Sequence, residues 1–324
     1  MRPMAFKPPA PTPKGLWRRT PPAIFPVMLG LLGLGLAWRR GAGEFGVPLA
    51  AVEGFMGAVT LLFLFGALAY AVKFARRPGM IIDELRVLPG RAGVAAGVLS
   101  VYLLAGSLGP YAPDEARPVL LLGLALHLAL IGLVLVGFAR GPVEQRRVNP
   151  VWHLHFSGLV VAAMVAQGLG VAALVAPLFW GALGVAVAIW AVSLDQFRRE
   201  TVPAPLRPLL AIHLAPLSLL GTVAQGMGFT GLALGFGVLS ALLLAALVLG
   251  GRWLLAAGQS PLWGALTFPL AATASFWLTL GGVWRLPGGL LLVAATLAIP
   301  PIAVFVLKLW AKGQLAVKTN AAIA

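Results

Sequence analysis

The stretch PVLLLGLALHLALIGLVLVGFA, residues Pro118–Ala139, decides the fold class of this chain. It has the length of a bilayer-spanning helix, which needs roughly 20 mostly apolar residues. It carries no charged side chain, and His127 is its one ionisable residue. A helix that is apolar on all sides has no face to turn toward water. The stretch therefore predicts a transmembrane α-helix.

On either side of this segment, the chain divides at its charges, glycines and prolines into apolar stretches of similar length. We therefore predict an all-α membrane protein with ten transmembrane helices. The predicted spans are Pro21–Trp38, Ala50–Phe74, Arg91–Leu108, Pro118–Ala139, Pro150–Leu174, Pro177–Leu194, Leu206–Gln225, Phe229–Gly250, Pro261–Gly281 and Pro287–Trp310. Almost no polar residue marks the links near Val175 and Met227, so each is also compatible with a re-entrant break.

Composition supports the membrane assignment. Hydrophobic residues make up 60% of the chain and charged residues 10%, too few charges for a water-soluble surface. The chain has no cysteine, which excludes disulfides and thiol-based metal sites. Its formal charge of +15 is spread between apolar spans instead of forming one basic face, so we expect no nucleic-acid partner. We also expect no cofactor and no resident metal.

Lysine and arginine in the short connections predict the orientation. With ten spans, all but four of the 24 basic residues fall on one side. The exceptions are Arg39, Arg40, Arg117 and Arg285. Both termini are therefore expected in the cytoplasm of a bacterium, around a multi-pass protein of the inner membrane. We expect residues 1–20 to form a basic, proline-rich, disordered tail near lipid headgroups, residues 21–311 the pore domain, and residues 312–324 a second cytoplasmic tail.

Prolines divide the predicted spans into two kinds. The first, fifth, seventh and ninth carry proline inside or just after their cytoplasmic start, whereas the second, fourth, sixth and eighth have none in their interior. Internal proline kinks a helix and frees a carbonyl, which membranes tolerate where protein or a water-filled cavity covers the break. We therefore expect kinked odd-numbered helices around a pathway and straight even-numbered helices outside them, although membrane helices in general use proline often.

Acidic residues are nearly absent from the predicted spans. Glu53 lies near the outer end of the second span and Asp195 at the inner end of the sixth. Cation carriers and proton-coupled pumps place carboxylates at membrane depth. A neutral lining approached through basic loops suits a small anion instead.

Other functional classes make different predictions. A ten-helix drug or metabolite exporter has the same size and is the main alternative, but it predicts an inverted repeat of five helices. The prolines eight residues apart in both the seventh and ninth spans argue mildly against that repeat. A membrane enzyme would need paired acids for magnesium, and the pairs at 83–84 and 114–115 are isolated in loops. We expect no enzyme. The same patterns remain compatible with a structural or sensory membrane protein.

Four short motifs resemble the tellurite-resistance and C4-dicarboxylate transporter family, which includes yeast malate and sulfite transporters and the slow-type anion channels of plants. The motifs are Gly30-Leu31 through Leu36-Ala37-Trp38, Glu144-Gln145-Arg146-Arg147 with Asn149-Pro150, Leu214-Ala215-Pro216, and Leu262-Trp263-Gly264-Ala265-Leu266-Thr267-Phe268-Pro269. The resemblance implies five helical hairpins around a central pore, commonly in a homotrimer. It also implies that a phenylalanine of the ninth helix closes the pore, and the match assigns that role to Phe268.

Residues at similar depth are candidates for the pore lining. They are Phe25, Pro26, His155, His213, Pro216, Thr267, Pro269 and Ala272. A ring of protonated imidazoles would attract anions, whereas histidines bonded to neighbouring helices would serve packing only. Both interpretations stay open for His155 and His213. Two departures from the family pattern affect this lining: His155 stands where a proline is common, and the third span lacks an interior proline.

Overall fold

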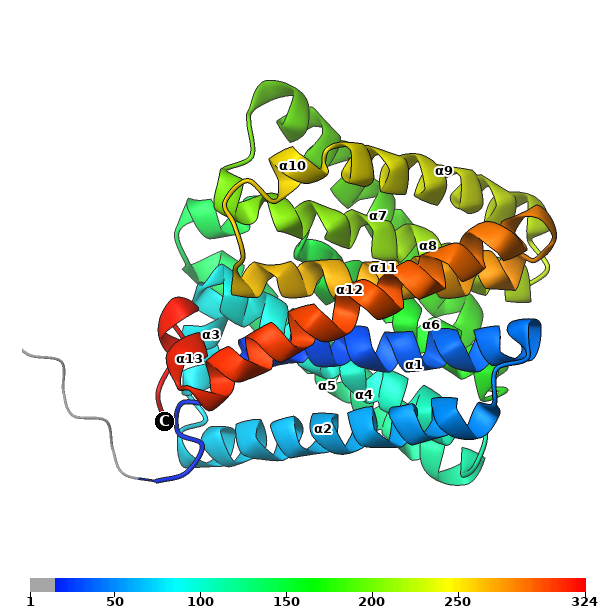
Figure 1. The fold of residues 1–324 in the computed structure, drawn as a ribbon. Helices are drawn as coiled ribbons and strands as arrows, with labels where there is room; N and C mark the ends of the chain where they lie inside the picture. The colour runs from blue at the N-terminus through cyan, green and yellow to red at the C-terminus, as the bar shows by residue number, and fades with distance from the viewer. Residues whose placement is uncertain (1–14) are drawn as a thin grey trace, which may run out of the picture.

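The computed structural model describes residues 15–324, which form helices and connecting turns without a strand (Figure 1). Eight helical segments within this range are long and apolar enough to cross a membrane. They are Pro22–Phe45 (α1 with a preceding 3₁₀ turn), Leu49–Arg76 (α2), Leu88–Leu108 (α4), Pro113–Arg140 (α5), Ala172–Arg199 (α7), Ala204–Gly226 (η4 and α8), Thr230–Leu249 (α9) and Gly282–Ala311 (α12 with a preceding 3₁₀ turn). The protein is therefore an all-helical, multi-pass membrane protein.

Two further helices are shorter. α6 covers Leu159–Gly168 and follows a π-helical turn, η3, at His153–Ser157. α11 covers Gly264–Leu280 and follows a 3₁₀ turn, η5, at Pro261–Trp263. These two segments correspond to the predicted fifth and ninth spans.

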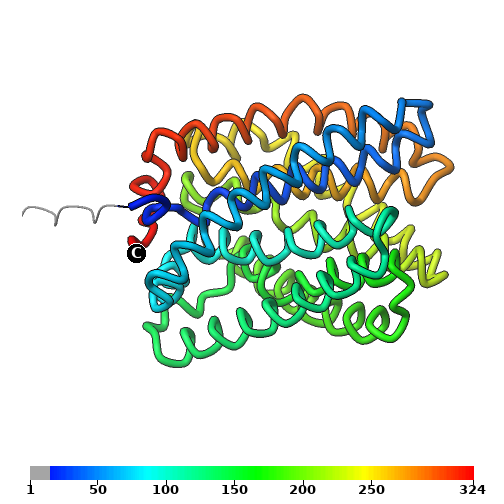
Figure 2. The backbone as a smooth tube through the Cα atoms, turned by 90° about the horizontal axis from the view of Figure 1, so that it is seen from below, coloured from blue at the N-terminus to red at the C-terminus, as the bar shows by residue number. Residues whose placement is uncertain are grey.

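The long helices form an inner and an outer layer. α1, α4, α6, α8 and α11 contact one another in a closed ring, and α2, α5, α7, α9 and α12 each pack beside the inner helix that neighbours them in sequence (Figures 1 and 2). In the most apolar stretch of α1 and of η4–α8, 78% of the residues are buried, against 22–33% for the five outer helices. The outer layer thus supplies the lipid-facing surface.

Proline does not separate the two layers as the sequence predicted. α5 and α7 begin about five residues before their predicted starts, so Pro118 and Pro177 lie inside these outer helices. α12 also contains Pro300 and Pro301. Irregular backbone is more frequent in the inner layer: 3₁₀ or π turns precede four of its five helices, α1, α6, α8 and α11, and one outer helix, α12. A proline near the start of each of these segments removes a backbone donor and prevents a regular first turn.

The two weakly marked links are tight turns at glycine. Gly170 connects α6 to α7 with φ +70°, and Gly228 connects α8 to α9 with φ +82°. Glycine adopts this left-handed conformation without steric cost. The first turn therefore lies before Ala172, and Val175, where the sequence placed the link, is inside α7.

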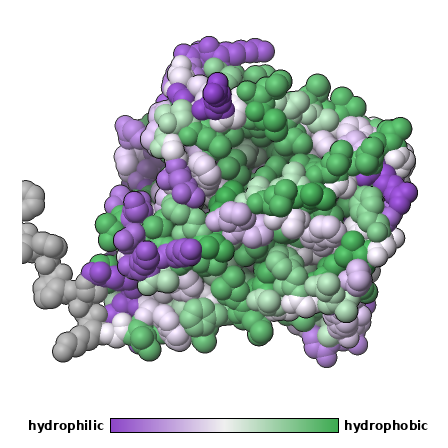
Figure 3. All heavy atoms as spheres, viewed as in Figure 1, coloured by the Kyte–Doolittle hydropathy of each residue, from purple (hydrophilic) through white to green (hydrophobic). Residues whose placement is uncertain are grey.

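Hydrophilic side chains gather toward the two ends of the bundle, with apolar surface between them (Figure 3). The two ends of the described chain meet at one of these ends (Figure 1). There the Ala324 amide donates to the Arg18 carbonyl at 3.1 Å, and the Arg18 guanidinium donates to the Ala324 carbonyl at 2.8 Å. We call this the terminal end.

The described part of the predicted N-terminal tail is packed. Trp17 contacts the ring of Phe65 on α2, and Thr20 is buried. The C-terminal residues form α13 (Gln314–Lys318), whose Leu315 is fully buried, and then fold back onto the bundle. Residues 1–14 of the predicted tail lie outside the described residues.

A buried ion pair fixes the short helix α3 (Met80–Arg86) to the terminal end of α2. Lys73 Nζ lies 2.5 Å from Glu84 Oε1, and both side chains are inaccessible to solvent. Lys73 also donates to the Thr20 carbonyl, and Glu84 accepts from the Ala322 amide. One pair of charges therefore joins both ends of the chain to the bundle.

Candidate functional site

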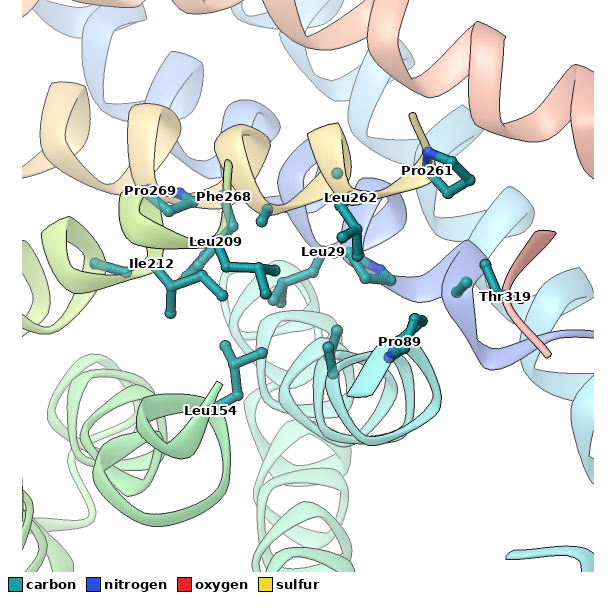
Figure 4. A pocket seen from close by; sticks show the side chains of 17 residues that line it. Leu29, Pro89, Leu154, Leu209, Ile212, Pro261, Leu262, Phe268, Pro269 and Thr319 are labelled. Atoms are coloured by element: carbon teal, nitrogen blue, oxygen red, sulfur yellow. The ribbon is translucent and has the colours of Figure 1, made fainter. Parts of the chain in front are cut away.

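A small cavity of about 40 Å³ lies between the inner helices at the terminal end. Its wall comes from all five inner segments (Figure 4). Leu29 of α1, Leu154 of η3 and Leu209 of η4 lie around the space beside Phe268. Thr319, just after α13, lines it as well. The cavity is therefore closed laterally by the inner ring and bordered by the C-terminal segment.

The irregular starts of the inner helices build this wall. Pro261 and Leu262 of η5 line the cavity, as do Leu209 and Ile212 of η4. Pro26, in the first turn of α1, and Pro89, in the first turn of α4, also face it. Non-helical backbone at membrane depth is stable where it is buried in protein or lines a cavity. The prolines that interrupt these helices thus coincide with the cavity.

Phe268 lies about one helical turn into α11 and is 6% exposed. Its ring packs against the bare backbone of Gly33 on α1: a Cβ added at Gly33 would lie 2.9 Å from the ring's Cδ2. Phe268 also lines the cavity, next to Pro269. The Phe268 ring therefore packs between α11 and α1 and borders the cavity.

Thr267 has a different environment from its neighbour. Its hydroxyl donates to the Gly264 carbonyl at 2.7 Å and lies 3.1 Å from the Pro26 carbonyl, and it packs where Gly30 has no side chain. Thr267 is fully buried and is not among the residues that line the cavity. It joins α11 to α1 at the level of Phe268.

Three other lining candidates also lie outside the cavity wall. The ring of Phe25 packs edge-on against Phe63 and Tyr70 of α2, on the outer side of α1. Pro216 and Ala272 are buried among the inner helices. Of the eight predicted lining residues, Pro26 and Pro269 are the two that line this cavity.

His153 and His213 bond to each other behind the cavity wall. His153 Nε2 lies 3.0 Å from His213 Nδ1, and His153 Nδ1 lies 2.8 Å from the Ser157 hydroxyl. The bond links η3 to η4, beside the lining residues Leu154 and Ile212. A hydrogen bond between two imidazoles requires one donor and one acceptor nitrogen, so it holds with both rings neutral.

His127 and His155 are also occupied by packing. His127 Nε2 lies 2.9 Å from the His155 carbonyl, and Tyr102 Oη lies 3.1 Å from His127 Nδ1. His155 Nδ1 bonds the Val151 carbonyl at 3.0 Å, which places its proton on Nδ1 and leaves Nε2 a buried acceptor without a partner. Neither His155 nor His213 lines the cavity. These contacts match the packing interpretation of the histidines.

Sequence reasoning missed most of the wall. Leu29, Leu154, Leu209 and Ile212 are ordinary residues for a membrane helix and carry no distinguishing signal. One signal was available: Pro89, Ala92 and Ala96 recur at helical spacing on one face of α4, and all three line the cavity. Small residues along one face indicate close packing or a space beside the helix.

Among residues 15–324, no charged side chain lines this cavity. Lys73 and Glu84 neutralise each other nearby, and Glu53 and Asp195, the two acids of the predicted spans, pair with Arg39 and Arg199. An apolar wall of this kind offers a cation no carboxylate ligand and an anion no cationic side chain.

Comparison with known proteins identifies the family. No curated protein matches the chain. The model of the SLAC1 family, described as voltage-dependent anion channel, matches residues 19–311, which include the inner ring and its outer layer. Members of this family are channels and transporters, the class that an apolar cavity inside a ring of membrane helices suits. The match covers nearly the whole chain and confirms the resemblance drawn from the four motifs, so the chain belongs to the voltage-dependent anion channel family.

Proposed function

We propose that this protein is a channel or transporter in which small inorganic or organic anions follow the axis of the inner ring and Phe268 is the gate. One observation carries the proposal: in a chain of this family, the cavity at the terminal end is bounded by the Phe268 ring, seated on Gly33. The uncharged wall supports it, since weak binding allows an ion to leave as well as enter. The exporter alternative is not favoured by the family match.

The proposal includes ten transmembrane spans arranged as five hairpins. Eight segments meet the length requirement, and the two shorter ones, η3–α6 and η5–α11, occupy equivalent places in the inner ring. A broken helix start shortens the regular part of a span without shortening the span itself. We further propose that the protein is a homotrimer in the bacterial inner membrane with both termini cytoplasmic, as the family resemblance and the loop charges imply.

Reporter fusions test this topology. Fusions near Pro142 and Val202 are expected to report the cytoplasm, and those near Pro113 and Pro287 the periplasm, because basic residues concentrate in the first pair of loops. Alkaline phosphatase and green fluorescent protein, which are active on opposite sides, give complementary readouts. One inverted loop would refute the ten-span arrangement.

Liposome flux tests the transport mechanism. Anion movement is expected to follow the anion gradient and the voltage without obligatory proton movement, because no acid of the described residues lines the cavity and the buried acid Glu84 is paired with Lys73. Chloride efflux is measured with the voltage set by potassium and valinomycin, while a dye records internal pH. Protons moving in fixed ratio with chloride would refute uncoupled transport, and protein-free liposomes give the background leak.

A further inference from the structure

The wall of the cavity leaves the source of anion preference unexplained. Its described lining consists of alanine, proline, leucine, isoleucine, glycine and phenylalanine, and Thr319 adds the one polar side chain found in this part of the chain. Such a wall does not distinguish an anion from a cation. If the proposed function holds, a positive potential from outside the lining side chains supplies the distinction.

Among the described residues, three charged side chains are buried: Lys73, Glu84 and Arg91. The first two form an ion pair and cancel at a distance. Arg91 is 7% exposed and has no ion pair with an acid. It is therefore the uncompensated buried charge in this part of the chain.

The contacts of Arg91 are neutral. One guanidinium nitrogen donates to the backbone carbonyl of Gln145 at 3.2 Å, and the guanidinium carbon lies 5.6 Å from the centre of the Phe138 ring. Its Nε is buried without a partner. Carbonyl and ring contacts hold the cation in place but leave its unit charge intact.

Arg91 also lies beside the cavity. It directly precedes Ala92, and Pro89, Ala92 and Ala96 form the face of α4 that lines the space. Its guanidinium reaches the Phe138 ring of α5 and the Gln145 backbone carbonyl, so it lies behind the face of α4 that lines the cavity. Because Arg91 is 7% exposed, solvent and salt screen its charge less than that of a surface residue.

We propose that Arg91 determines the anion preference of the cavity: its unpaired guanidinium, behind the Ala92 face of α4, supplies the positive potential that the apolar lining lacks. It attracts small monovalent anions such as chloride and repels cations without touching either. Burying a charge without a counter-ion is costly, and a role in ion selection gives this charge a function.

The test compares charge-removing and charge-keeping variants in liposomes or planar bilayers. The readouts are the chloride-to-potassium permeability ratio, from reversal potentials in a potassium chloride gradient, and the half-saturating chloride concentration. Arg91→Gln is expected to lower the ratio about three- to tenfold and to raise the half-saturating concentration by a similar factor. Arg91→Lys is expected to keep both near the wild-type values.

Two further variants make the result specific. Arg252→Gln removes the same charge from an exposed position beyond α9 and is expected to change neither readout, because solvent and salt screen that charge. Gln145→Glu leaves Arg91 in place and adds a carboxylate to the residue whose backbone carbonyl the guanidinium binds, so it is expected to change the ratio in the same direction as Arg91→Gln. If Arg91→Gln does not fold, Gln145→Glu still tests whether the charge of Arg91 sets the permeability ratio.

The outcomes separate this inference from the proposed function. If wild-type protein passes chloride but Arg91→Gln and Gln145→Glu keep its permeability ratio, the role of Arg91 is refuted while anion transport stands. An equal fall in Arg252→Gln would also overturn it, because net charge would then be responsible. If the wild-type protein and the Phe268→Ala variant both pass no anion, the proposed function itself fails.

Discussion

Replacing Phe268 with alanine is expected to raise anion flux per protein molecule several-fold or more. The substitution removes the ring that packs on Gly33 and borders the cavity, while Pro269 and the path of α11 stay the same. If the ring were only a packing element, the opposite result would follow, because truncating a buried phenylalanine typically costs about 3–5 kcal/mol and would lower the amount of folded protein. Liposome flux normalised to reconstituted protein distinguishes the two.

Phe276 provides the matched control. It lies on the same helix, is fully buried, and packs on Gly221 of α8 as Phe268 packs on Gly33 of α1. It does not line the cavity. Phe276→Ala is therefore expected to lower stability without raising flux. Equal flux increases in the two variants, or no increase in Phe268→Ala, would contradict the gate assignment.

Glu84→Ala is expected to lower the free energy of unfolding by about 3–5 kcal/mol, because it leaves the Lys73 ammonium buried without its counter-charge. Burial raises the pKa of the Glu84 carboxyl, and the Lys73 ammonium opposes this shift. The substitution also removes the acceptor of the Ala322 amide, so the C-terminal segment loses a contact near the cavity. Thermal unfolding in detergent, followed by circular dichroism, measures the effect.

Two controls identify the buried charge as the cause. Asp83→Ala removes a partly exposed acid on the same short helix, which pairs with Arg77 and Arg86, and is expected to change stability by less than about 1 kcal/mol. The double variant Lys73→Met/Glu84→Leu removes both charges and is expected to recover most of the loss. A double variant as unstable as Glu84→Ala would show that shape, and not charge, determines the effect.

Eight of the ten predicted spans coincide with helices long enough to cross a membrane, but some of their ends differ from the prediction. Pro118–Ala139 lies wholly inside α5, which starts earlier, at Pro113. The extra turn contains Asp114 and Glu115, charges that hydropathy excludes from a span but that a helix N-terminus favours. Hydropathy predicts the part of a helix that lies in lipid, whereas backbone hydrogen bonding determines the residue at which the helix itself begins.

The structure places three of the predicted site residues at the cavity. Phe268 and its neighbour Pro269 do lie at the cavity, and so does Pro26. The place of Phe268 came from a family motif, since composition alone does not distinguish one membrane phenylalanine from another. The roles of the histidines were uncertain because the position of a residue along a span predicts its depth in the membrane but not the direction in which its side chain points. In the structure, His153 and His213 come from separate segments and face each other, and neither lines the cavity.

The amino-acid sequence by itself determined that the chain lies in a membrane, roughly where it crosses, and which loops carry the basic residues. These properties depend on the local balance of apolar and charged side chains, which each segment carries within itself. Tertiary structure alone decided four other features. They are the closed inner ring, the packing of the Phe268 ring on Gly33, the folded-back C-terminal segment and the unpaired charge of Arg91. Each depends on contacts between residues far apart in the chain. Inside a membrane, such contacts form where complementary surfaces and small residues let helices approach closely, and a hydropathy profile hardly records either property.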